Sequence, residues 1–198
     1  MKKTIAAVAI AGLCAYAAAA QADVIPYANP GVPNPVNYTF TAASTGDVTA
    51  YFYGSTAAYD NQLTMLVNGV ATGIVGLDNH TSPYGQALSF GHVNAGDSLV
   101  FELVNVSPGG IGPWYSQTSL NSDGVNHVYS TSFSGDATIP VGTFVSFEDL
   151  PGGGDFNYND EDFVFKNVAT SVPEPGTLAL LGISLLGLGI AKRRNKAG

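Results

Sequence analysis

The sequence predicts an all-β fold, with antiparallel sheets arranged as a β-sandwich or jelly roll. Between Asn34 and Val168, short runs alternate apolar and polar residues, and no helical periodicity is convincing. Val, Thr, Tyr and Phe dominate these runs, whereas Gly, Asn, Asp and Pro separate them, which is typical of strands joined by turns. Asn68-Gly69 lies between two apolar runs, and both residues tolerate the positive φ of a tight hairpin. Regularly spaced short strands favour a sandwich.

The first element is a predicted secretory signal peptide over residues 1–22. A short basic start precedes an apolar stretch, and the small-x-small triplet Ala-Gln-Ala at 20–22 ends it. This order predicts export across the inner membrane and cleavage before Asp23. The single cysteine, Cys14, would leave with the peptide, so we expect no thiol or disulfide in the exported part.

The body of the chain begins with a Pro-rich extended lead-in over residues 23–35. A β-sandwich domain over residues 36–168 follows, and residues 169–171 form a brief linker. The predicted strands are Val36–Ala42, Val48–Tyr53, Leu63–Val67, Val70–Val75, Ala87–Val93, Leu99–Asn105, His127–Phe133, Val141–Phe147 and Phe163–Val168.

The charges are distributed very unevenly along the chain. Only 11% of the residues are charged, against roughly a quarter in an average globular chain. Fourteen of the 15 acidic residues but only one basic residue, Lys166, lie between Asp23 and Val172, which gives this segment a formal charge of −13. A nucleic-acid partner is excluded because phosphate contacts need clustered Lys and Arg.

Six carboxylates fall within residues 148–162 without a basic residue among them. Packed into a compact loop, they would repel one another and raise one another's pKa unless a cation lay between them. The alternating side chains of Asp155, Asn157 and Asn159 would present oxygen atoms to one point, and Asp160 and Asp162 would complete the coordination shell. A glycine turn would bring the chain back towards Glu148. The predicted Ca²⁺ ligands are Glu148, Asp149, Asp155, Asn157, Asn159, Asp160 and Asp162. The alternative is a solvated acidic turn.

This is not an EF-hand loop, although its first half has a similar spacing. Asp160 stands where that loop needs glycine, and Lys166 stands where it needs a bidentate glutamate. If calcium binds, it therefore binds in a different arrangement.

A second candidate site combines aromatic and amide side chains between residues 114 and 127. Sugar sites use a flat aromatic face against the pyranose ring and amide or carboxylate groups for its hydroxyls. The candidate carbohydrate ligands are Trp114, Tyr115, Asn121 and Asp123. An equally good interpretation is a buried tryptophan beside an ordinary turn.

We do not expect an enzyme. The tetrad Gly-Asp-Ser-Leu at 96–99 occurs in a large esterase family, but it lies mid-chain and is predicted to be a turn that leads into a strand. Asp123 and His127 are four residues apart, whereas the Asp-x-x-His pair of those esterases is three apart. Without a base to activate it, Ser98 is not a nucleophile. The adjacent carboxylates Glu148 and Asp149 would point to opposite faces of a strand, unlike a glycosidase pair.

The C-terminal segment, residues 172–198, has three parts: Val172-Pro173-Glu174-Pro175, a 15-residue apolar stretch over residues 177–191 and a basic cluster with Arg193 and Arg194. The apolar stretch is shorter than the roughly 20 residues of a membrane span. It predicts a short apolar helix that enters the inner membrane transiently, with the basic cluster on the cytoplasmic side. The alternative is a permanent anchor.

The order and spacing of these parts resemble the PEP-CTERM sorting signal of Gram-negative bacteria. The resemblance implies recognition by an exosortase-type transpeptidase, removal of the helix, and delivery to the cell surface or to an exopolysaccharide (biofilm) matrix.

The segment from Phe147 to Phe165 resembles the DUF4114 family, a secreted bacterial module. The shared pattern is an aromatic-Glu-Asp-Leu, a glycine turn, an Asp-aromatic-Asn-Tyr-Asn-Asp run and a β-strand. We expect the similar region to span about residues 125–168. The resemblance implies a β-rich surface module that is stabilised by calcium and has no known catalysis.

Together these observations predict an exported, exosortase-sorted protein of the cell surface or matrix, with a structural or binding role and a calcium-stabilised sandwich. The alternative is a calcium-assisted carbohydrate-binding module whose partner is extracellular polysaccharide.

Overall fold

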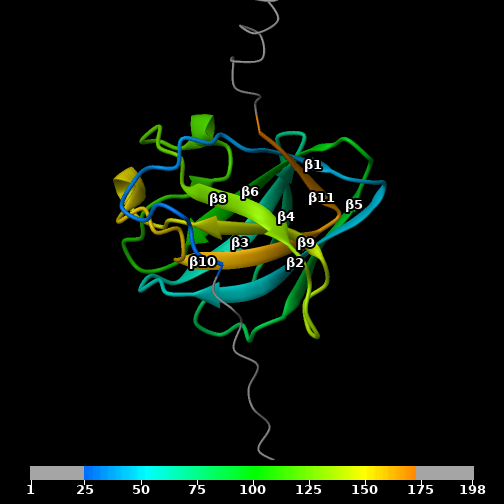
Figure 1. Cartoon of the computed structure of the whole chain (residues 1–198), viewed down its shortest axis with the longest axis horizontal. Helices are drawn as coiled ribbons and strands as arrows, with labels where there is room; N and C mark the ends of the chain where they lie inside the picture. Colours follow the sequence, from blue (N-terminus) through cyan, green and yellow to red (C-terminus); the bar gives the residue numbers. More distant parts are fainter. Residues whose placement is uncertain (1–24, 173–198) are drawn as a thin grey trace, which may run out of the picture.

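The computed structural model describes residues 25–172, which form two antiparallel β-sheets that pack against each other (Figure 1). Sheet A has the strand order β11-β1-β6-β3-β4, and a short strand, β7, also pairs with β6. Its strands are β1 (Thr39–Ala42), β3 (Asn61–Val67), β4 (Val70–Gly76), β6 (Ser98–Asn105), β7 (Trp114–Tyr115) and β11 (Val168–Ser171). The predicted all-β sandwich is confirmed.

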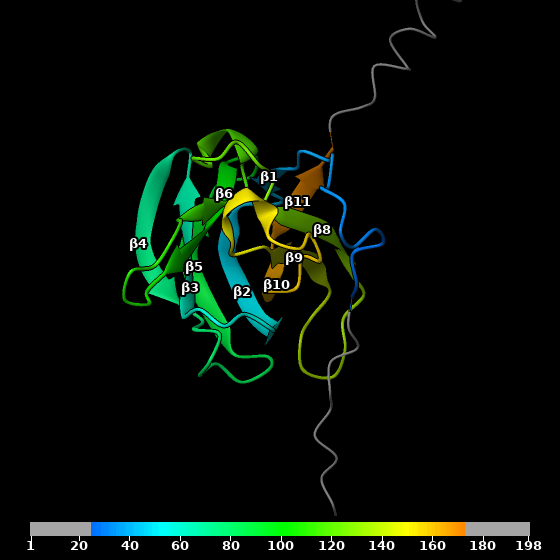
Figure 2. The same ribbon diagram turned by 90° about the vertical axis from the view of Figure 1, so that its left-hand side faces the viewer.

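Sheet B has the order β5-β2-β10-β9-β8. Its strands are β2 (Gly46–Ser55), β5 (Ala87–Val93), β8 (Val128–Phe133), β9 (Gly142–Phe147) and β10 (Glu161–Lys166), and two short 3₁₀ turns, η1 (Thr118–Leu120) and η2 (Pro151–Gly153), lie in the loops. In Figure 2, β3 and β4 lie to the left, and β9 and β8 of sheet B lie to the right.

The predicted signal peptide and the sorting signal after Val172, including its apolar helix, lie outside the described residues. Within residues 25–172, no helix has the length and hydropathy that a membrane span requires.

The strands largely follow the predicted runs. β5 has the predicted bounds, and the hairpin between β3 and β4 turns at Asn68-Gly69 with φ values of 51° and 79°. The predicted esterase-like tetrad is a turn, in which the Asp97 N–H donates to the Asn94 carbonyl and Ser98 begins β6.

Two strands, β7 and β11, were not predicted. The linker expected over residues 169–171 is instead part of β11, whose residues pair with β1 from Thr39 opposite Ser171 to Ala42 opposite Val168. The prediction was wrong because this short segment lacks an apolar alternation, and its strand geometry comes from the neighbouring strand. The sorting segment therefore starts directly where the sheet ends.

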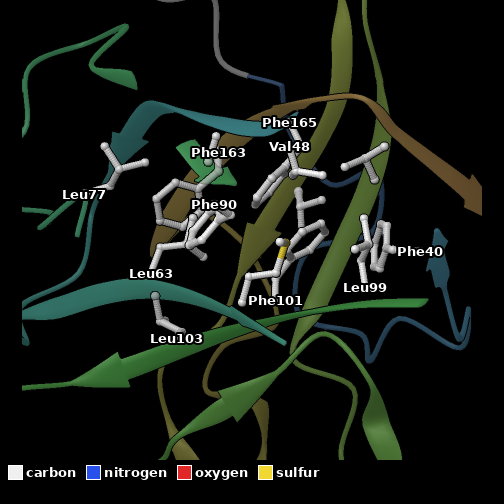
Figure 3. Close-up of a cluster of buried hydrophobic side chains, with 14 of the residues drawn as sticks. Phe40, Val48, Leu63, Leu77, Phe90, Leu99, Phe101, Leu103, Phe163 and Phe165 are labelled. Atoms are coloured by element: carbon white, nitrogen blue, oxygen red, sulfur yellow. The ribbon is translucent and has the colours of Figure 1, made fainter. Parts of the chain in front are cut away.

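The main core lies between the sheets (Figure 3). The Phe101 ring from β6 stacks on the Phe165 ring from β10, with centroids 3.8 Å apart and planes 17° from parallel. Val48, Leu63 and Phe163 are fully buried in the same cluster. Burying an apolar side chain of this size contributes about 1.5–3 kcal/mol, so this cluster is the main source of the stability of the sandwich.

The outer face of sheet B is also covered. A second cluster there contains Tyr53, Phe133, Ile139, Phe144 and Val164. The predicted lead-in packs on this side, where the Tyr27 ring lies 5.3 Å from that of Tyr129 and 4.9 Å from that of Tyr158. Burial on both faces explains why successive residues in the middle of β9 and β10 are apolar, at Phe144-Val145 and at Phe163-Val164-Phe165.

Candidate functional site

The acidic segment is the loop between β9 and β10, shown in yellow at the left-hand edge of Figure 1. Its 3₁₀ turn contains Pro151 at the start, and Gly152, Gly153 and Gly154 all have positive φ. These glycines turn the chain back over Glu148, as predicted. A Cβ atom at position 154 would lie 2.7 Å from Glu148 Oε2, which leaves space for glycine only.

We expect Gly154→Ala to lower the free energy of unfolding by about 1–3 kcal/mol, because it adds both backbone strain and a contact with a buried carboxylate. Gly152→Ala is the matched control, since Gly152 has a φ of 72° but nothing within 4 Å of the added Cβ. Urea unfolding of both variants measures the difference. Equal losses would contradict the close approach of Gly154 to Glu148.

Glu148 is buried beneath this turn, with 1% of its surface exposed. Its Oε1 accepts the Tyr158 N–H at 2.6 Å. Burial raises the pKa of Glu148 to about 8, although the hydrogen bond from Tyr158 acts to lower it. The nearby carboxylates of Asp160 and Asp155 also contribute to the raised pKa.

Asp149 and Asp160 lie next to each other across the loop. The Asp149 N–H donates to Asp160 Oδ2 at 2.9 Å, and the Asp149 carbonyl accepts the Trp114 Nε1–H at 2.6 Å. Burial raises the pKa of Asp160 to about 6, and the carboxylate of Asp149 adds to the shift.

Glu161, which was not among the predicted ligands, is fully buried at the first position of β10. Asn61 of β3 links it to the loop, because Asn61 Nδ2 donates to Asp149 Oδ2 at 2.8 Å and to Glu161 Oε1 at 2.6 Å. The second oxygen of Glu161, Oε2, and the amide oxygen of Asn61, Oδ1, are buried without a hydrogen-bond partner. Each such atom costs about 1–3 kcal/mol. Burial raises the pKa of Glu161 well above its ordinary value.

Asp162 lies on the opposite face of β10 from Glu161, because successive strand residues point to opposite sides. Its carboxyl contacts Ser146 Oγ on β9, which also contacts the Tyr158 carbonyl oxygen. A hydroxyl has one hydrogen and a carbonyl only accepts, so both bonds form when Asp162 is protonated. Burial raises the pKa of Asp162 to about 7, in agreement with this arrangement. Asp162 therefore does not share an ion with Glu161.

The alternating residues of the loop use their oxygens locally. Asp155 accepts hydrogen bonds from the Asn157 N–H at 3.1 Å and from Asn157 Nδ2 at 2.9 Å, and Asn157 Oδ1 accepts the Asn159 N–H at 3.1 Å. Asn159 Oδ1 accepts the Thr56 hydroxyl at 2.8 Å. The bonds of Asp155 and Asn157 are Asx turns within the loop, whereas Asn159 bonds outside it, so the three side chains do not direct their oxygens to one point.

The aromatic and amide candidates support this loop from inside. Trp114 is 3% exposed, and its ring stacks on that of the buried His127 with a centroid separation of 4.0 Å. Asn121 is buried and bonds the backbone of Tyr115 and Val125. These positions match a buried tryptophan beside a turn, and Trp114 does not form an exposed sugar platform.

Asp123 contacts the acidic loop, which the sequence did not indicate. Its Oδ2 accepts the Gly152 N–H at 2.8 Å and lies 2.9 Å from His127 Nε2. His127 Nδ1 lies 2.8 Å from the Glu148 carbonyl oxygen. Both ring nitrogens face oxygens, so His127 and Asp123 hold the two ends of the 148–152 turn. Only the fold reveals this role, since the lone histidine has no motif around it.

Among the described residues, no lysine or arginine forms an ion pair with the carboxylates of this end. Within residues 25–172, the ion pairs join histidine to aspartate: His80 with Asp60, His92 with Asp47 and His127 with Asp123. In the same part of the chain, no three His, Cys, Asp or Glu side chains form a ready-made metal site. The loop brings Glu148, Asp149, Asp160 and Glu161 to one end of the sandwich, but as neighbouring pairs.

The fold and site define a two-sheet β-sandwich with an anionic loop closed over one end. Residues 84–167 match the model of DUF4114, described as a domain of unknown function, and residues 171–194 match the PEP-CTERM protein-sorting motif. Both matches agree with the resemblances that the sequence indicated. No curated protein and no solved structure matches it.

The domain match begins before β5, earlier than the predicted start near residue 125, so it includes β5 to β10. The sorting match includes all the predicted motif residues: Val172, Pro173, Glu174, Pro175, Arg193 and Arg194. This motif implies export, processing by an exosortase and surface association in Gram-negative bacteria.

Proposed function

We propose that this protein is a structural and binding component of the bacterial surface or exopolysaccharide matrix, without catalytic activity, whose sandwich is stabilised by Ca²⁺ at the β9–β10 loop. The sorting motif supports the surface role. A matrix polysaccharide is the proposed partner. Trp114 would not be its contact, because that side chain is buried.

One observation carries the calcium part of this proposal. Glu148, Asp149 and Glu161 are buried at one end of the fold, each 3% exposed or less, and within residues 25–172 none of them forms an ion pair with a lysine or arginine. A buried ionised carboxylate is very costly unless it is paired or coordinates a metal. A hard divalent cation would supply the missing charge, and carboxylate and amide oxygens are the ligands that Ca²⁺ prefers.

Calcium should raise the melting temperature of the full chain, purified in a mild detergent. An affinity on the order of 0.1–1 mM is typical of extracellular modules. At about 10 mM Ca²⁺, this affinity gives ~1.4–2.7 kcal/mol of added stability, which corresponds to several degrees. Thermal melts with Ca²⁺ and with excess chelator measure it, and Mg²⁺ at the same concentration is the control. Superimposable curves with Ca²⁺ and chelator would contradict the calcium role.

A further inference from the structure

We infer that the ion is held between the two sheets by Asn61, Asp149 and Glu161, and not by the alternating residues 155–159. This inference rests on the proposed calcium function and places the ion in the fold. It replaces a loop site, which the sequence indicates, by a site that joins sheet A to sheet B.

The first line of evidence is the pair of buried oxygens without partners. Glu161 Oε2 and Asn61 Oδ1 are both buried, and their residues are 0% and 1% exposed. Native proteins satisfy nearly all such atoms with a protein group, a water or an ion. These two atoms belong to side chains that contact each other, and Asn61 also contacts Asp149. A cation bound to both oxygen atoms would satisfy them together.

The second line of evidence is the position of the Asn61 amide nitrogen. It lies 2.8 Å from Asp149 Oδ2 and 2.6 Å from Glu161 Oε1, so its two hydrogens are the bridge between two carboxylates. One amide group therefore holds two carboxylates next to each other, and two ionised carboxylates repel each other unless a cation balances their charge.

The surrounding contacts hold Asn61 and Asp149 in place by their backbones, and Glu161 pairs with Phe147 of β9. The Asn61 N–H donates to Asn79 Oδ1 at 2.8 Å, and Asn79 Nδ2 donates to the Tyr59 carbonyl at 2.9 Å. Asp149 is held through its own N–H by Asp160 and through its carbonyl by Trp114. Support of this kind around the ligands orients them before an ion arrives.

The chemistry of the three groups selects the class of ion. Two carboxylates and one amide supply only hard oxygen ligands, and His127 is engaged by Asp123 and the Glu148 carbonyl. Zinc and copper prefer nitrogen and sulfur, whereas calcium accepts six to eight oxygens in a flexible arrangement. Magnesium requires a stricter octahedron and releases its waters reluctantly, so Ca²⁺ is the favoured occupant.

The alternating residues are the competing location, and their hydrogen bonds argue against it. Asp155 and Asn157 direct their oxygens to backbone and amide N–H groups within the same turn. Asp155 is also exposed, so that water serves it without an ion.

The test compares Glu161→Gln with Asp155→Asn, two substitutions that each remove one charge and keep the shape of the side chain. Calorimetric titration of the full chain with Ca²⁺ measures affinity. We expect Glu161→Gln to weaken binding by about tenfold or more, since even the loss of a group that supports a ligand costs 10–100-fold. Asp155→Asn should bind within about twofold of the unmodified chain.

A melting experiment keeps the test informative if a variant changes stability by itself. In chelator, Glu161→Gln should melt higher than the unmodified chain, because it removes a buried carboxylate, and it should gain little from Ca²⁺. Asn61→Asp should show the reverse: a lower melting temperature in chelator and a larger gain with Ca²⁺, because it replaces a neutral amide ligand with a charged carboxylate.

Tb³⁺ in place of Ca²⁺ gives a direct readout of location. Trp114 is the only tryptophan of the chain, and its ring nitrogen bonds the Asp149 carbonyl. Tryptophan-selective excitation should therefore sensitise Tb³⁺ emission, and excess Ca²⁺ should suppress it. Emission should be lost in Glu161→Gln and kept in Asp155→Asn.

The outcomes separate the location from the function. If Ca²⁺ stabilises the unmodified chain and Glu161→Gln equally, whereas Asp155→Asn abolishes binding, the inter-sheet location is wrong and the calcium function stands. If Ca²⁺ neither binds nor stabilises the unmodified chain, the calcium function itself fails.

Discussion

In the presence of a chelator, the protein should melt at least about 5 °C lower at about pH 8.5 than at about pH 5.5. Burial raises the pKa of Asp162 to about 7 and that of Glu148 to about 8, and it also raises the pKa of Glu161. In the unfolded chain these groups titrate near pH 4. Between pH 4 and pH 8 the folded state therefore keeps protons that the unfolded state has released, so stability falls as the pH rises.

Other acidic groups do not obscure this trend. Four carboxylates have a lowered pKa in the folded state: Asp78, Asp97, Asp123 and Asp136. They lose their stabilising effect only when the pH falls below this window, towards their lowered pKa values. His80 has a raised pKa because of its hydrogen bond with Asp60, and it acts in the same direction as the buried acids. His80→Gln is therefore the control, and it should keep most of the pH dependence.

Asp162→Asn tests the source of the effect. The amide offers an N–H to Ser146 Oγ in place of the carboxyl proton but cannot ionise, so this variant should be more stable than the unmodified chain at about pH 8.5 and show a weaker pH dependence. Differential scanning calorimetry in chelator measures both. A melting temperature that rises with pH in this window would contradict buried, protonated carboxyls at this end of the fold.

Replacing Trp114 with alanine should lower the free energy of unfolding by about 3–5 kcal/mol, as expected for a tryptophan removed from a core. The substitution leaves a cavity, removes the stacking on His127 and leaves the Asp149 carbonyl without its 2.6 Å donor. Because Asp149 is a proposed ligand, calcium affinity should also fall.

Leu120→Ala is a suitable control, since Leu120 is 44% exposed in the neighbouring 3₁₀ turn and its loss should cost below about 0.5 kcal/mol. Chemical denaturation of both variants gives the comparison. A Trp114→Ala protein of unchanged stability that fails to bind matrix polysaccharide would show that Trp114 acts as a sugar contact, contrary to its burial.

Much of the fold was predictable because strand and turn signals are local. The alternation of Ala87–Val93 and the Asn68-Gly69 turn depend on residues next to one another, and both predictions agree with the structure. β7 and β11 were missed because they have only two and four residues, respectively, and no pattern of their own. They are strands because β6 and β1 offer them unpaired backbone groups.

The candidate site was only partly predictable for the same reason. The sequence shows that residues 148–162 are rich in carboxylates, and the glycine turn that folds them back is also a local signal. It does not show that Asn61 lies against Asp149, because the two residues are 88 positions apart and meet across the sheets. It also does not distinguish Glu161 from Asp162, since their faces are set by the register of β10 with β9.

The sequence by itself determines the all-β class, the sorting motif at the C-terminal end and the concentration of negative charge in one loop, and it predicts an export signal at the N-terminal end. These properties follow from composition, short-range periodicity and linear motifs. Only the tertiary structure decides which carboxylates are buried, which backbone groups they bind and that Trp114 lies inside. Burial and long-range contact depend on how two sheets pack, and sheet packing brings together residues whose separation along the chain carries no sign of their meeting.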